Sequence, residues 1–278
     1  RLRVRFLAGI EIILYYKMMI GFLVKKTFFD LWDNMFRIVL LNLGFIASVA
    51  ITVFIPGILP LPALSLVALA AGMLWCSIYL AASALSVKAI SDYGSFGFAD
   101  FFGNLKAGWP AGLAMGFAVF ALFAMIRIII PFYLELNSMI GLLLAAVIFW
   151  TLALAIVSLQ FFFAIRTRLD TKLVKVLKKC FIVFFDNPGF SIFCLLHNIL
   201  ILAISVVLAF LLPGPAGILL FLDEALRLRL LKYDWLELNP ESGPPSRRRK
   251  IPWDTILIDE REKTGTRSLR NFIFPWKD

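Results

Sequence analysis

The chain of 278 residues is 61% hydrophobic, has a mean hydropathy of +0.90 and contains only 17% charged residues. A water-soluble domain carries about 25% charged residues, so this composition excludes a soluble globular fold and favours a polytopic membrane protein. The formal net charge of +10 is typical of cations that gather at one membrane surface, and we expect no nucleic-acid partner.

The chain opens with the basic and apolar stretch "RLRVRFLAGIEIILYYK". Glu11 interrupts its apolar run, and no small-residue cleavage site follows, so we do not interpret it as a signal peptide. Met18 and Met19 are candidate initiators. We therefore assign residues 1–24 to an N-terminal extension and expect the membrane domain to occupy residues 25–232.

Six runs in the membrane domain predict transmembrane helices, because about 20 apolar residues in a helix cross the hydrocarbon core. The last run is only half apolar. We predict an all-α fold of about six transmembrane helices in three hairpins. The predicted spans are residues 36–56, 62–87, 110–131, 139–165, 189–212 and 216–232.

Along the chain, connections that contain Lys and Arg alternate with connections that contain none. All but one of the 28 Lys and Arg residues fall in segments on one predicted side of the membrane, and the exception is Arg127. The positive-inside rule then places both termini in the cytoplasm. A sixth crossing over 216–232 is needed for this assignment, because otherwise the basic tail would lie outside.

Each predicted outward helix follows a similar phrase that ends in Asn: "LWDN" at 31–34, "FFGN" at 101–104 and "FFDN" at 184–187. From each Asn to the proline of the next outer turn the distance is 26 or 27 residues. Aromatic rings favour the headgroup level, and Asp, Asn or Gly supplies caps and turns. We predict that each hairpin is preceded by an amphipathic aromatic cytoplasmic element.

The stretches "FFDLWDNMFRIVLLNLGF" and "FADFFGNLKAGWPAGLAMG" resemble the YesL-like family of bacterial membrane proteins, over roughly residues 25–232. The resemblance implies about six helices and a multi-pass protein of the bacterial cytoplasmic (inner) membrane. It also implies a link to carbohydrate uptake, because members are often encoded beside such systems. The family offers no accepted catalytic residues to carry over.

Asp223, Glu224 and Arg227 are the strongest candidates for a site, because ionisable groups at membrane depth are costly. Arg227 stands four residues after Asp223 and three after Glu224, a spacing that predicts ion pairs along one helix. The alternative is a lined cavity or a partner contact.

Three further polar residues within predicted spans, Asn42, His197 and Asn198, are candidate members of the same intramembrane cluster. For His197 and Asn198 the structural alternative is a hydrogen bond to a neighbouring helix.

The sequence offers little catalytic machinery. It has a single histidine, no phosphate-binding or metalloprotease motif and three cysteines without C-x-x-C spacing. We therefore predict a non-enzymatic protein without cofactor, metal or catalytic residues. The favoured function is an accessory or scaffold component whose partner is the bilayer and a transporter subunit or another membrane protein. The alternative is a small-solute transporter with a polar site among the hairpins.

The tail, residues 233–278, is predicted to be a cytoplasmic basic segment. Its interaction candidates are the two "PW" tryptophans and a run of cations, which are Trp253, Trp276, Arg247, Arg248, Arg249 and Lys250. Three outcomes stay open for it: docking on the protein's own cytoplasmic surface, lying on the membrane, or binding another protein.

Overall fold

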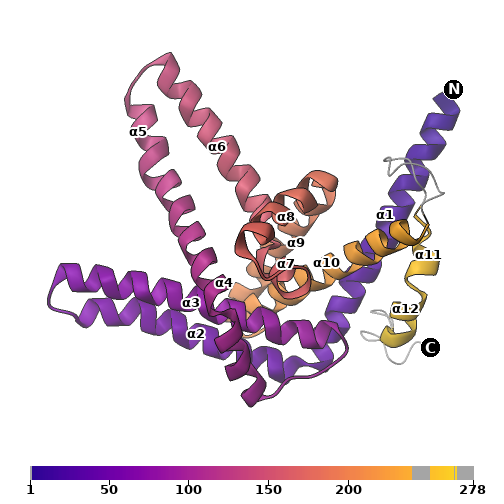
Figure 1. Cartoon of the computed structure of the whole chain (residues 1–278), viewed down its shortest axis with the longest axis horizontal. Coiled ribbons are helices and arrows are strands. Elements are labelled where there is room, and N and C mark those ends of the chain that lie inside the picture. Colours follow the sequence, from indigo (N-terminus) through magenta and orange to yellow (C-terminus); the bar gives the residue numbers. More distant parts are fainter. Residues whose placement is uncertain (1, 240–250, 266, 268–278) are drawn as a thin grey trace. The chain divides into compact units, whose positions relative to one another are not determined.

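The computed structural model describes residues 2–239, 251–265 and 267, with side chains from residue 18 onward. Within these ranges every regular element is a helix. The chain divides into two compact units, residues 35–223, here called the membrane unit, and residues 1–34 with 224–278, here called the terminal unit. Helix α10 begins in the membrane unit and ends in the terminal unit (Figure 1).

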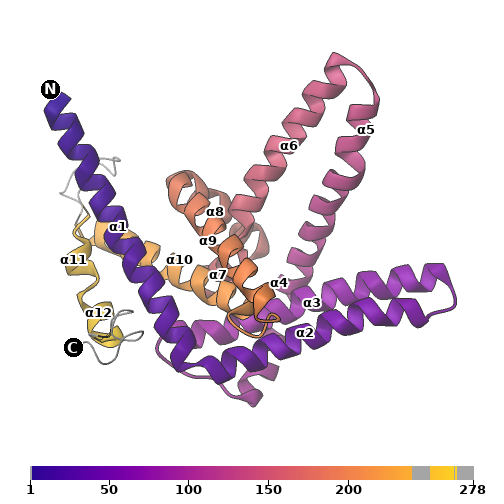
Figure 2. The same ribbon diagram turned by 180° about the vertical axis from the view of Figure 1, so that it is seen from behind.

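The membrane unit is a series of antiparallel helices (Figure 2). A π-helical turn, η1, carries α4 directly into α5, and the segment from Phe98 to Glu135 is one continuous apolar helix. The elements are α2 (Met35–Ile58), α3 (Pro62–Ser91), α4 (Phe98–Ala124), η1 (Met125–Ile129), α5 (Ile130–Glu135), α6 (Met139–Leu159), α7 (Phe162–Arg168), α8 (Leu173–Asp186), α9 (Pro188–Val207) and the start of α10 (Gly214–Leu238).

Five helices in the described part of the chain are long and apolar enough to cross a membrane. They contain the first four predicted spans and residues 189–207 of the fifth, and the protein is an all-α polytopic membrane protein. The sixth predicted span, residues 216–232, is not among them. It lies on α10, where four charged residues interrupt the apolar run, so the crossing of this segment stays a prediction. Those residues are Asp223, Glu224, Arg227 and Arg229.

Large apolar side chains cover the outer faces of these helices. Phe54, Phe117 and Trp150 are each more than half exposed, on α2, α4 and α6. A soluble protein rarely leaves such contiguous apolar surface in water, whereas acyl chains cover it without penalty. The exposed side chains therefore indicate a lipid bilayer environment.

Helices α3 and α4 approach closely through glycines at four-residue intervals on α4, which are Gly108, Gly112 and Gly116. A Cβ atom on Gly112 would lie 2.4 Å from the Cα atom of Ile78, so no side chain fits there without a shift of α3. Small residues at such spacing let membrane helices pack backbone to backbone. The G-x-x-x-G-x-x-x-G spacing was visible in the sequence but was not used above.

Helices α2 and α3 are joined by neutral hydrogen bonds. The Tyr79 hydroxyl donates to the carbonyl of Leu41 at 3.0 Å, and the indole N–H of Trp75 donates to the Ser48 hydroxyl at 3.2 Å. Both bonds satisfy polar side chains inside an apolar pair without burying a charge.

The three Asn residues of the repeated phrase do not occupy equivalent places. Asn34 lies in the turn between α1 (Leu2–Asp33) and α2, and Asn187 lies between α8 and α9. Asn104 instead lies inside α4, where its side chain donates to the Ser86 hydroxyl of α3 at 3.0 Å. The predicted equivalence therefore holds for the first and third copies and fails for the second, because a helix runs through the phrase there.

The terminal unit contains α1, the second part of α10, α11 (Trp253–Ile256) and α12 (Ile258–Thr264). Trp253 and Leu257 are buried, and α11 contacts α1. Of the three outcomes left open for the tail, residues 251–265 follow the first, since they dock on the chain itself. Arg247, Arg248, Arg249, Lys250 and Trp276 lie outside the described residues.

Candidate functional site

Helix α10 is buried nearly all round from Ala216 to Arg229. Ala216, Leu220, Phe221, Ala225 and Leu226 are at most 2% exposed. A helix covered on every side cannot turn its charges to water, so each charged group needs a protein partner. The partners of its charged residues therefore decide what this helix does.

In the membrane unit, Asp223 is held by Arg168, the last residue of α7. The Nε atom of Arg168 donates to Oδ1 of Asp223 at 2.9 Å, and Nη2 donates to Oδ2 of the same carboxylate. The two side chains are 9% and 2% exposed. This fork-shaped contact is the strongest geometry available to an arginine and a carboxylate.

Arg168 also reaches the end of α3. Its Nη1 atom donates to Asp92 at 3.0 Å, and its Nη2 atom donates to the Ser91 hydroxyl at 2.9 Å. One guanidinium thus ties together the ends of α3 and α7 and the middle of α10. Sequence reasoning missed Arg168, which had been counted only among the cations of a connection. The available signal was that Arg168 ends one apolar run while Asp223 interrupts another.

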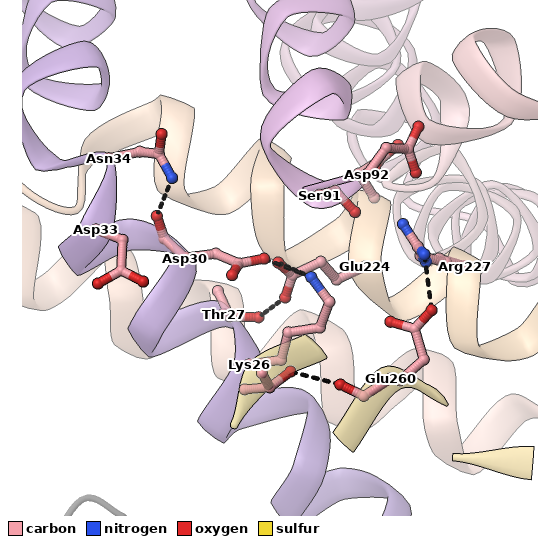
Figure 3. Close-up of polar contacts among 12 residues, drawn as sticks. Lys26, Thr27, Asp30, Asp33, Asn34, Ser91, Asp92, Glu224, Arg227 and Glu260 are labelled. Carbon is pink, nitrogen blue, oxygen red and sulfur yellow. Dashed lines mark hydrogen bonds and ion pairs between the residues drawn. The ribbon is translucent and has the colours of Figure 1, made fainter. Parts of the chain in front are cut away.

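In the terminal unit, Glu224 lies in a buried set of side chains from α1 (Figure 3). Lys26 Nζ donates to Asp30 Oδ2 and lies 3.4 Å from Glu224 Oε1, while the Thr27 hydroxyl donates to Glu224 Oε2. Lys26, Thr27 and Glu224 are at most 3% exposed. Burial raises the pKa of Glu224 well above its usual value, and the charge of Lys26 opposes that rise.

Arg227 pairs with the tail. Its Nη2 atom donates to Oε1 of Glu260 on α12 at 2.7 Å. The two carboxylates that the spacing offers to Arg227 bind cations from other helices, Asp223 to Arg168 and Glu224 to Lys26. Spacing along one helix identifies which side chains of that helix can meet, but it does not identify partners on neighbouring helices.

Asn42 is fully buried in α2 and binds the connection between α9 and α10. Its Nδ2 atom donates to the carbonyls of Leu211 at 3.0 Å and Pro213 at 2.8 Å, and its Oδ1 atom accepts from the backbone N–H of Ala216 at 2.9 Å. Gly214 has φ +61°, and a Cβ there would lie 2.3 Å from Asn42 Nδ2. One amide thus satisfies three backbone groups of an irregular turn.

His197 and Asn198 point to different neighbours. The imidazole of His197 stacks on the ring of Phe221, with ring centroids 3.8 Å apart. Asn198 Nδ2 lies 3.5 Å from Gln160 Oε1, at the limit of a hydrogen bond. Among the described contacts, the six candidate residues are therefore distributed over separate helix–helix contacts.

The tail makes two more polar contacts in the terminal unit. Arg267 donates through both Nη atoms to Asp33, at 2.9 and 2.8 Å, and Lys25 Nζ donates to the carbonyl of Gly265 at 3.3 Å. Together with the pair of Arg227 and Glu260, these contacts hold residues 251–265 and Arg267 against the chain. The roles of Asp33 and Glu260 were not foreseen, because each partner is more than 30 residues away in sequence.

Chemically, this arrangement joins helices. Asp223, Glu224 and Asn42 bind groups of other elements, whereas Nδ1 of His197 and Oδ1 of Asn198 are buried without a hydrogen-bond partner. The described residues include no group of three or more His, Cys, Asp or Glu side chains placed to hold a metal ion. Comparison with protein-family models, curated proteins and solved structures finds no match for the sequence.

Proposed function

We propose that this chain is a non-enzymatic accessory or scaffold protein of the bacterial inner membrane, with both termini in the cytoplasm. The observation that carries the proposal is the use of the charges on α10. Asp223 is bound to Arg168 in the membrane unit, and Glu224 is bound to Lys26 and Thr27 in the terminal unit. Charges committed to joining helices favour a fixed framework over a substrate site.

The proposed link to carbohydrate uptake rests on the resemblance of residues 25–232 to the YesL-like family. The corresponding partner is a transporter subunit or another membrane protein, bound beside the lipid. The predicted cytoplasmic side is the one that carries the basic connections and the tail.

Cross-linking in native membranes followed by affinity purification tests this proposal. We expect a transporter subunit to copurify with the intact chain, and to be lost when Arg168→Met loosens the framework. Asp92→Asn, which removes the charge of a half-exposed partner of Arg168, is the matched control and should retain the partner. Purification of the chain alone from cross-linked membranes would contradict the proposal.

A second candidate function, a small-solute transporter, is favoured by the break between α9 and α10. Ala209 and Phe210 have positive φ angles of 51° and 59°, and Asn42 lies only seven residues after the first residue of α2. Irregular backbone inside a membrane protein occurs where it is buried in protein or lines a cavity, and broken helices carry the sites of many transporters.

Uptake by the purified protein in vesicles separates the two functions. A transporter accumulates a solute without any partner, and a folded Asn42→Asp variant should lose this accumulation, because it replaces both amide donors with an acceptor. A scaffold shows no uptake in either form. Solute-dependent thermal stabilisation of the purified protein would favour the transporter.

A further inference from the structure

Helix α8 (Leu173–Asp186) lies between two apolar helices that are long enough to cross a membrane. The apolar helix before it ends at Arg168, and the next one begins at Pro188. Only residues 169–187 lie between them, and α8 occupies most of this segment. The helix therefore lies within a few residues of the bilayer at both of its ends.

One side of α8 is buried in the protein. Val176, Cys180 and Val183 are at most 7% exposed and follow the four- and three-residue spacing of one helix face. This face packs against α6, α7 and α9. Burial raises the pKa of the Cys180 thiol to about 12, as expected for a side chain shielded from water.

A second side is apolar and exposed. Val174 is 80% exposed and Phe185 is 60% exposed. Phe185 follows Val174 by eleven positions, about three helical turns, so both side chains lie on the same side of the helix. Leu177, 37% exposed, lies at the edge of this side nearest the protein. A helix at the bilayer boundary can place such side chains among the upper acyl carbons.

Exposed cations lie beside this apolar side, since Lys178 stands four residues after Val174. Lys172, Lys175 and Lys178 follow at three-residue intervals, are exposed, and make no ion pair within the described part of the chain. The neighbouring Lys179 instead binds Asp170 at 3.4 Å. Lysines in the first turns are not placed to stabilise the helix dipole, which favours cations at the other end. They are available to an external anion.

We propose that α8 lies in the headgroup plane and binds anionic phospholipids. Lys172, Lys175 and Lys178 contact the lipid phosphates, while Val174 and Phe185 enter the acyl boundary. Charge complementarity and the attachment of both ends to membrane helices identify a lipid surface as the partner. This inference goes beyond the proposed scaffold function and does not depend on it.

Titration of the purified full-length protein in detergent micelles with fluorescent phosphatidylglycerol tests the proposal, with phosphatidylcholine as the comparison. Each lysine near an anionic surface is expected to contribute about a fivefold gain in affinity, so Lys175→Gln with Lys178→Gln should weaken phosphatidylglycerol binding on the order of 25-fold. Binding of phosphatidylcholine should stay unchanged.

Two further variants make the test decisive. Lys106→Gln removes one charge from an exposed lysine on α4 and should change the affinity less than twofold. Lys175→Arg with Lys178→Arg keeps both charges and should retain binding, which separates charge from any loss of folding. The proposal is overturned by equal losses in the Lys106 control, by equal binding of both lipids, or by competition from free glycerol phosphate at the affinity of the lipid.

Discussion

The first hairpin, α2–α3, and the third helix pair, α9–α10, bury their polar groups in different ways. The tip of the first hairpin, around Gly57 and Leu61, is exposed, and its helices are joined by neutral hydrogen bonds. The turn of the third pair buries Gly214 and Ala216 against Asn42, and α10 then continues with paired charges.

The difference shows how surroundings decide which residues a helix can carry. A lipid-covered hairpin offers no counter-charge, so small residues and neutral hydrogen bonds hold it together. A helix covered by protein can hold Asp and Glu, because neighbouring helices supply the cations. Four substitutions with their controls test this comparison.

Replacing Arg168 with Met should lower the free energy of unfolding by about 3–5 kcal/mol, because Asp223 would remain buried without a cation. Reversible unfolding in mixed micelles measures this loss. Adding Asp223→Leu should restore most of it. The control Asp92→Asn, whose side chain is 41% exposed, should change stability by less than about 1 kcal/mol. Equal effects of Arg168→Met and Asp92→Asn would show that the buried contact does not hold α10.

Replacing Asn42 with Leu should lower the free energy of unfolding by roughly 2–4 kcal/mol, because three backbone groups of the turn lose their partner. In the first hairpin, Tyr79→Phe removes one hydrogen bond and should lower it by only about 0.6 kcal/mol. The same unfolding measurement compares the two. Similar losses would mean that the buried turn is no more dependent on its side-chain partner than the exposed hairpin.

Replacing Gly112 with Ala should destabilise the close contact of α3 and α4 by about 1–3 kcal/mol, because the new methyl group would meet the backbone of Ile78. Gly103→Ala on the same helix is the control, since nothing lies within 4 Å of the added Cβ. Its higher helix propensity should raise stability by up to about 1 kcal/mol. Thermal unfolding of both variants measures the difference, and a shift in the same direction for both would contradict a backbone-to-backbone contact.

The free energy of unfolding should also depend on pH, because of the Glu224 carboxyl group. Its pKa is raised in the folded protein by burial, so the folded chain holds a proton that the unfolded chain has already released. The free energy of unfolding therefore falls as pH rises from the ordinary carboxyl range through the raised pKa. Glu224→Gln should flatten this fall, measured as the unfolding free energy across that range. Glu237→Gln, an exposed carboxylate on the same helix, should leave the slope unchanged.

Much of the fold followed from local properties of the chain. The first five spans were predicted because an apolar run of about 20 residues has few alternatives to a membrane helix. The sixth is not among these apolar helices, because Asp223 and Arg227 shorten its apolar run, and its crossing stays a prediction that rests on the cation count. The repeated phrases suggested three equal hairpins, but Asn104 lies within a helix and Asn187 does not.

The candidate site was predicted only as a set of residue types. Asp223, Glu224 and Asn42 were singled out because polar groups in apolar runs need partners. Their partners, Arg168, Lys26 and the turn at 211–216, could not be inferred, because each lies more than 50 residues away in sequence.

The sequence by itself determined that this chain is an all-α membrane protein, because composition and run length depend on no distant contact. Packing between distant segments set how α10 uses its charges and where residues 251–265 dock. Those choices depend on which helices meet, and every charge on a buried helix has several possible partners until packing brings one of them within hydrogen-bond distance.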